Sequence, residues 1–183
     1  MILNRGWLLS AFLLMASWAV LSRPATLRTI SADVYVDKVR GAWQAALVAN
    51  HTGLVHEGEY LDEPSPADII ELVLLETWPT DDDTAVEWVD LHILETYGLE
   101  PTYTQIRDEW VNHLNNDIWC STLRARQLMD QGVLPPETGG ADRNPEGVWS
   151  IDAQLQTELF GLIAPGLPKQ AARRAIFFAR VTN

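Results

Sequence analysis

Apolar residues recur at helical spacing along most of the chain after residue 33. Side chains three or four positions apart share one face of a helix, so such a stripe predicts an amphipathic helix packed on a core. The first stripe predicts a helix over Tyr35–Ala49. Its members are Val36, Val39, Trp43, Ala46 and Leu47.

Start and stop residues divide the rest of the pattern into further helices. Ser65-Pro66 predicts the start of a short helix that continues through Leu75, while Gly98 and Gly132 are predicted stops. The other predicted helices are Thr84–Tyr97, a helix capped by Thr104 that includes Leu114, Leu123–Gln131, Ile151–Phe160 capped by Ser150, and a last helix from Lys169. No segment alternates clearly with the period of two typical of strands. The pattern therefore predicts an all-α fold.

Residues 132–149 interrupt the helical pattern with several prolines and glycines. This composition predicts an irregular loop, longer than most loops in compact domains. Loops of that length are often functional.

The N-terminal region has a different pattern. Arg5 precedes an apolar run over Trp7–Leu21, which is short for a membrane span and suits a signal peptide. We therefore expect a signal peptide or membrane anchor over 1–21, a linker over 22–33 and a helical domain over 34–183. The expected location is periplasmic or extracellular, or tethered to a membrane, and it becomes cytoplasmic if the start codon is misassigned.

Charge and composition exclude some functions. The formal net charge of -12 argues against binding to a nucleic-acid backbone, which requires clustered basic residues. An acidic protein that takes a phosphate-bearing ligand needs a metal ion or backbone amides to receive it.

Cys120 is the only cysteine, so no intrachain disulfide forms, and we expect its side chain to be buried. The four histidines show no HxxxH spacing typical of zinc, and His92 is expected to be solvated or hydrogen-bonded.

Three consecutive carboxylates, Asp81, Asp82 and Asp83, lie between Thr80 and Thr84. Two interpretations fit them. Aspartate caps helix N-termini and interacts favourably with the helix dipole there. Clustered carboxylate oxygens also suit hard divalent cations, Mg²⁺ above all. Local chemistry favours the cap.

Four segments, taken in their order and spacing, resemble one protein family. They are Asp37–Trp43, Gly53–Gly58, Asp81–Thr84 and Ile151–Gly166. The first is similar to the opening helix of the ADP-ribosylglycohydrolase family, and the second to the small-residue turn and glutamate that follow it. The third resembles that family's Thr-Asp-Asp-Thr metal motif, and the fourth a pair of helices in the middle of the domain. The resemblance covers nearly all of the chain after the linker.

The resemblance implies a multi-helix orthogonal bundle with a binuclear Mg²⁺ site. It implies hydrolysis of the glycosidic bond that joins ADP-ribose to a protein or small acceptor, so the expected partner is an ADP-ribosylated substrate. By the same analogy Asp82 and Asp83 are catalytic metal ligands, and Asp81 takes the position of the usual threonine among the ligands. Glu57 and Asp152 are the expected substrate-binding residues, although a helix-stabilising acid is the simpler interpretation of Asp152.

Some positions depart from the family pattern. Ala45 and Ala49 stand where the family favours glycine, and Asn50 where many members have aspartate. The family completes its metal site with a downstream Asp-x-Asp motif, which does not occur after residue 83. We therefore expect this chain to be the N-terminal part of the domain, either inactive alone or completed by a C-terminal half. The alternative is a non-catalytic helical module that binds a nucleotide or a protein.

Overall fold

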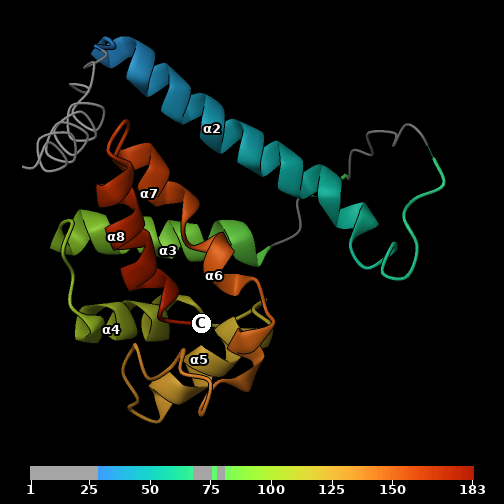
Figure 1. The fold of residues 1–183 in the computed structure, drawn as a ribbon, viewed down its shortest axis with the longest axis vertical. Coiled ribbons are helices and arrows are strands. Elements are labelled where there is room, and N and C mark those ends of the chain that lie inside the picture. Colours follow the sequence, from blue (N-terminus) through green and yellow to red (C-terminus); the bar gives the residue numbers. More distant parts are fainter. Residues whose placement is uncertain (1–28, 68–75, 78–80) are drawn as a thin grey trace, which may run out of the picture. The chain divides into compact units, whose positions relative to one another are not determined.

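A computed structural model describes residues 29–67, 76–77 and 81–183, and the described residues form helices and irregular segments without a strand (Figure 1). The predicted all-α class is confirmed. The finer expectation of an ADP-ribosylglycohydrolase-like bundle stays a prediction. The helices are α2 (Ala32–Gly53), α3 (Asp82–Tyr97), α4 (Tyr103–His113), α5 (Cys120–Asp130), α6 (Asp152–Leu155), α7 (Glu158–Ile163) and α8 (Pro168–Ala179), with short 3₁₀ turns η1 (Leu54–His56) and η2 (Pro145–Val148).

The chain divides into two units, residues 1–38 and 39–183. Of the first unit, the structure describes residues 29–38, which include the first turns of α2. The predicted signal peptide or anchor over 1–21 lies outside the described residues. So do residues 68–75 of the helix predicted from Ser65-Pro66 through Leu75, while its first residues, 65–67, are described and are not helical. Within the described part, no helix is both long enough and apolar enough to span a membrane.

The hydrophobic core of the second unit is built around the pair α3 and α4. The apolar stripe predicted for this helix consists of Val86, Val89, Ile93 and Tyr97; the first three form the buried face of α3, whereas Tyr97 is 37% exposed. Ile106 and Trp110 are the fully buried residues of α4. Each such side chain contributes about 1.5–3 kcal/mol when it leaves water. Gly98 ends α3 with a positive φ of 82°, so the predicted stop is also confirmed.

The predicted cap of α4 is wrong by two residues. Thr102, not Thr104, is the N-cap, and it forms a capping box with Gln105. Gln105 N donates to Thr102 Oγ1 at 3.3 Å, while Thr102 N donates to Gln105 Oε1 at 2.8 Å. The reciprocal pair satisfies two backbone donors and decides between two nearby threonines.

The single helix predicted over Ile151–Phe160 is two short helices, α6 and α7. Tertiary hydrogen bonds explain the break. Glu87 on α3 accepts a hydrogen bond from Leu159 N in the first turn of α7 at 3.0 Å. Gln156, between the two helices, is fully buried and donates to Thr182 Oγ1 at 2.9 Å. Ser150 Oγ accepts a hydrogen bond from Asp152 N at 3.4 Å and donates to Asp152 Oδ2, but the helix that begins there, α6, ends at Leu155.

The proline- and glycine-rich loop packs against the C-terminal residues. Asn144 is fully buried and its Nδ2 donates to the carbonyls of Ser121, Thr138 and Thr182 at 2.9, 3.0 and 3.1 Å. Gly147 lies so close to Thr182 that a Cβ there would stand 2.6 Å from Thr182 O. The loop is thus held by buried polar contacts rather than by regular structure.

The last helix closes the core against α7, and the two lie side by side in Figure 1. Phe178 on α8 and Phe160 on α7 are buried with ring centroids 4.8 Å apart. Phe177 stacks on Tyr103 of α4 with centroids 4.2 Å apart. These aromatic pairs join α8 to α4 and to α7, so all three helices contribute to one core.

Candidate functional site

Asp81 is the N-cap of α3, as the simpler of the two interpretations predicts. It accepts hydrogen bonds from Thr84 N at 3.3 Å and from Thr84 Oγ1 at 3.1 Å. Asn50 Nδ2 on α2 donates to Asp81 Oδ2 at 3.3 Å and to Thr84 Oγ1 at 3.2 Å. The carboxylate therefore starts α3 and ties that start to α2.

Asp82 and Asp83 occupy the first turn of α3, and together with Asp81 they form a tight carboxylate cluster. One oxygen from each of the three residues lies within 4.8 Å of the others. All three line a pocket of about 360 Å³ with Asn50, Glu57 and Trp119. Among the described residues that line this pocket there is no lysine, arginine or histidine. Its negative charge thus has no basic side chain on the wall to balance it.

The pKa values of Asp82 and Asp83 are raised, so the ionised form of each carboxylate is disfavoured in this pocket. Burial raises the pKa of Asp83 to about 6, and the charges of Asp81, Asp82, Glu158 and Glu57 add to the increase. Burial likewise raises the pKa of Asp82, with a further contribution from Asp152 and Asp81 and with backbone hydrogen bonds opposing it. A bound cation would relieve both effects, because it favours the ionised carboxylates.

Glu57 reaches this pocket from a distant part of the sequence. It follows the 3₁₀ turn η1 with an extended backbone, and its charge acts on Asp83. The structure therefore brings together four of the five predicted site residues: Glu57, Asp81, Asp82 and Asp83.

Asp152 has a different position. It is 6% exposed, and Oδ1 accepts a hydrogen bond from Thr122 N in the first turn of α5 at 2.7 Å. Ser150 Oγ donates to Oδ2. Asp152 lies in the first turn of α6, where the simpler interpretation expects it to stabilise its own helix, but its hydrogen bond is to the N-terminus of α5. Its charge still acts on Asp82.

A second pocket of about 270 Å³ adjoins the first and shares Asn50 and Asp83 with it. Its wall also includes Glu87 and Glu158. Burial raises the pKa of Glu87 to about 7, with the Leu159 N–H opposing the increase and Glu158 and Asp83 adding to it. The acidic surface therefore continues from the first pocket along α3.

Two pocket residues, Asn50 and Trp119, were not among the predicted site residues. The sequence provided a reason to expect Asn50 at the site, because it stands where many members of the ADP-ribosylglycohydrolase family, which this chain resembles, have aspartate. The sequence provided no reason to expect Trp119 there, because most tryptophans are expected in the core. Trp119 is 52% exposed and is the N-cap residue of α5.

The prediction for Cys120 is wrong. Its side chain is exposed at the start of α5, next to Trp119. Partial burial and the charges of Asp152, Glu146 and Asp82 raise the pKa of the thiol. A thiol in this acidic setting is a poor nucleophile at neutral pH.

Comparison of the chain with known protein families, with curated proteins and with solved structures finds no match.

Proposed function

We propose that the pocket at the start of α3 binds Mg²⁺ and that the protein hydrolyses the glycosidic bond of an ADP-ribosylated substrate. The observation that carries the proposal is the convergence of Glu57 with Asp82 and Asp83 in one pocket. Glu57 is far from Asp82 and Asp83 in the sequence, and the family resemblance implies that all three belong to one site.

The donor set fits a hard cation. Asp82 and Asp83 present carboxylate oxygens within 4.8 Å of each other, and their raised pKa values indicate negative charge that a cation would balance. Asp81 adds a third carboxylate, although its oxygens also cap α3. When bound, Mg²⁺ would supply charge to receive the diphosphate and would orient the ribose hydroxyls.

Other pocket residues supply binding and proton transfer. Glu57 lines the pocket from outside the carboxylate cluster of α3, so its carboxylate is the candidate to accept a proton from an attacking water. Trp119 presents an exposed aromatic side chain at the wall, a surface on which an adenine could stack. Asp152 contributes charge behind Asp82 and holds α5 in position.

The second candidate function is binding of a nucleotide without hydrolysis. It is favoured by the hydrogen bonds that engage Asp81 and Asp152 in helix capping, because they leave fewer carboxylates for metal ions. Export or membrane tethering of the protein stays part of the proposal, and it rests on the apolar pattern of residues 7–21.

Calorimetric titration of the full chain with Mg²⁺ and then with ADP-ribose tests binding, and release of ADP-ribose from a modified protein tests hydrolysis. We expect Asp83→Asn to abolish Mg²⁺ binding and Glu57→Gln to reduce hydrolysis by about 10²-fold or more while sparing metal binding. Asp108→Asn, which alters an exposed aspartate on α4, is the matched control. Binding of ADP-ribose that needs no Mg²⁺ and leads to no hydrolysis would support the second candidate, and no response to either ligand would refute both.

A further inference from the structure

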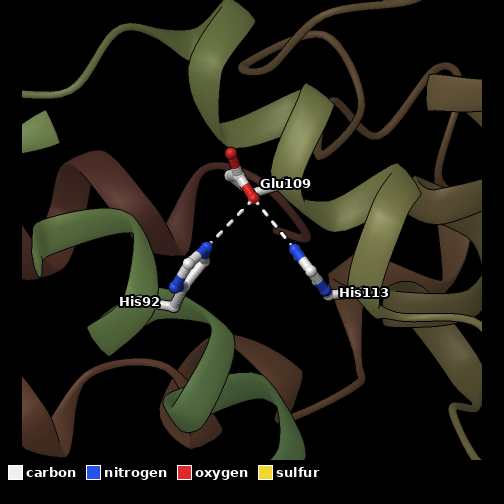
Figure 2. Close-up of side chains that lie close together, drawn as sticks. All are labelled: His92, Glu109 and His113. Atoms are coloured by element: carbon white, nitrogen blue, oxygen red, sulfur yellow. Dashed lines mark ion pairs between the residues drawn. The ribbon is translucent and has the colours of Figure 1, made fainter. Parts of the chain in front are cut away.

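A second cluster of potential metal ligands lies away from the acidic pocket, between α3 and α4. It consists of His92 on α3 with Glu109 and His113 on α4. Figure 2 shows both imidazole rings pointing a nitrogen at the same carboxylate oxygen of Glu109. His92 Nε2 lies 3.3 Å, and His113 Nε2 3.1 Å, from Glu109 Oε2.

We propose that His92, Glu109 and His113 bind a transition-metal ion of the Zn²⁺ type. In a tetrahedral zinc site with bonds of about 2.0–2.1 Å, neighbouring ligand atoms lie roughly 3.3–3.4 Å apart. Both distances to Glu109 Oε2 are close to that separation. All three ligand atoms lie within 4.8 Å of one another, so small side-chain rotations would bring them around one ion.

The carboxylate is held in place for this role. Glu109 is 8% exposed, and Tyr97 O–H donates to its other oxygen, Oε1, at 2.6 Å. This bond directs Oε2 toward the two histidines. An outer hydrogen bond of this kind is a common feature of metal ligands, since it fixes their orientation.

The imidazoles leave the site open to solvent. The side chains of His92 and His113 are 45% and 49% exposed, and their rings are nearly perpendicular, at 75°. Three protein ligands with access to water match the arrangement in which a fourth position holds a water molecule.

The ligand chemistry separates this site from the acidic pocket. Imidazole nitrogen selects zinc-like ions, whereas the oxygen-only pocket suits Mg²⁺. His92 lies ten positions after Asp82 on α3, which is about 15 Å along a helix axis. The inference therefore stands independently of the proposed hydrolase function.

Spacing within the sequence could not reveal the site. The two histidines lie on different helices, and only Glu109 and His113 have the four-residue separation that places side chains on one helix face. The ion would therefore link α3 to α4, the two helices that form the centre of the core, and should stabilise their pairing.

The test uses the full chain, first stripped of metal with a chelator. Titration with ZnCl₂ by calorimetry should show one bound equivalent, and CoCl₂ should give the strong visible absorption of four-coordinate Co²⁺. We expect His92→Gln and His113→Gln each to weaken zinc binding by more than about tenfold, and Tyr97→Phe to weaken it by about tenfold. The matched control is His56→Gln, which removes a histidine stacked on Tyr60 and should bind zinc as the wild type does.

Two further comparisons keep the result specific. The Asp82→Asn, Asp83→Asn double variant should retain the zinc equivalent, and zinc should raise the unfolding temperature of the wild type but not of Glu109→Gln. The metal-free unfolding temperature of each variant checks that it folds. The proposal is overturned if the wild type binds no zinc equivalent. It is also overturned if the double variant with His92→Gln and His113→Gln binds zinc as well as the wild type does.

Discussion

At the residue scale, Asp81, Asp82 and Asp83 have the same side chain but different roles, because α3 begins between them. Asp81 has an extended backbone, and its carboxylate accepts hydrogen bonds from Thr84. Asp82 and Asp83 are already helical, and their carboxylates line the pocket with raised pKa values. All three carboxylates line the pocket, but Asp81 alone of the three is also the N-cap of α3.

Replacement of the cap tests this division. We expect Asp81→Ala to lower the free energy of unfolding by about 1–2 kcal/mol, since it removes the cap of α3 and the acceptor of Asn50. Asp81→Ser should recover most of the loss, because serine also caps helices. Urea denaturation measures both variants, and equal stability of Asp81→Ala and the wild type would contradict the capping role.

Glu87 makes stability depend on pH. Its pKa in the folded protein is about 7, against an ordinary value of 4.5. Between these values the folded state binds more protons than the unfolded state, so stability should fall as pH rises from about 4.5 to 7. Glu87→Gln keeps an acceptor for Leu159 N and removes the charge. We expect it to weaken this dependence, most clearly between pH 6 and 7, and to add about 1 kcal/mol at pH 8, a value reduced for partial solvation.

Urea denaturation across pH 4–8 measures this effect. Glu95→Gln, on the exposed side of the same helix, is the matched control and should leave the slope unchanged. The raised pKa of Asp83, about 6, adds a slope at lower pH in both proteins. A slope between pH 6 and 7 that is as steep in Glu87→Gln as in the wild type would therefore assign this part of the pH dependence to other groups.

At the element scale, the proline- and glycine-rich loop is positioned by the last residues of the chain. Asn144 and Thr138 bond the carbonyls of Thr182 and Val181, at 3.1 and 2.7 Å. Ser150, the residue that follows this loop, bonds Asp152, whose charge acts on Asp82 in the acidic pocket. The order of the loop therefore supports the pocket through α6 and the start of α5.

Close packing of this loop predicts a strong effect of one methyl group. A Cβ at Gly147 would lie 2.6 Å from Thr182 O, so Gly147→Ala should cost about 1–3 kcal/mol of stability. Gly161→Ala, within α7, meets no atom within 4 Å and should be neutral or stabilising. Thermal unfolding compares the two, and a Gly147→Ala protein as stable as the wild type would show that the loop can move away at little cost.

At the scale of the whole molecule, the two candidate metal sites use the same helix, α3, about 15 Å apart along its axis. Each bound ion should stabilise the folded state by mass action. Sites this far apart without shared ligands usually act additively. We therefore expect the increases in unfolding free energy from saturating Mg²⁺ and Zn²⁺ to sum within about 0.5 kcal/mol. A sum that falls well short would indicate that the ions compete for one site.

Sequence reasoning was most successful where local physics dominates. The stripe of Val86, Val89 and Ile93 is buried as predicted, and the stop at Gly98 is confirmed. It failed where distant groups compete with local preference. The helix predicted over residues 151–160 is broken because Glu87 and Thr182 bond Leu159 and Gln156. The cap predicted at Thr104 is a local error instead, because the capping box that Thr102 forms with Gln105 lies within three residues.

For the candidate site, the sequence by itself determined the all-α class, the acidic charge and the carboxylates at the start of α3. These follow from periodicity and residue type, which act over a few positions. Only the tertiary structure decided that Glu57 joins Asp82 and Asp83, that Asp152 instead caps α5, and that two histidines on separate helices meet at Glu109. These contacts between distant residues depend on how the helices pack. Packing is determined by the core as a whole rather than by any local segment.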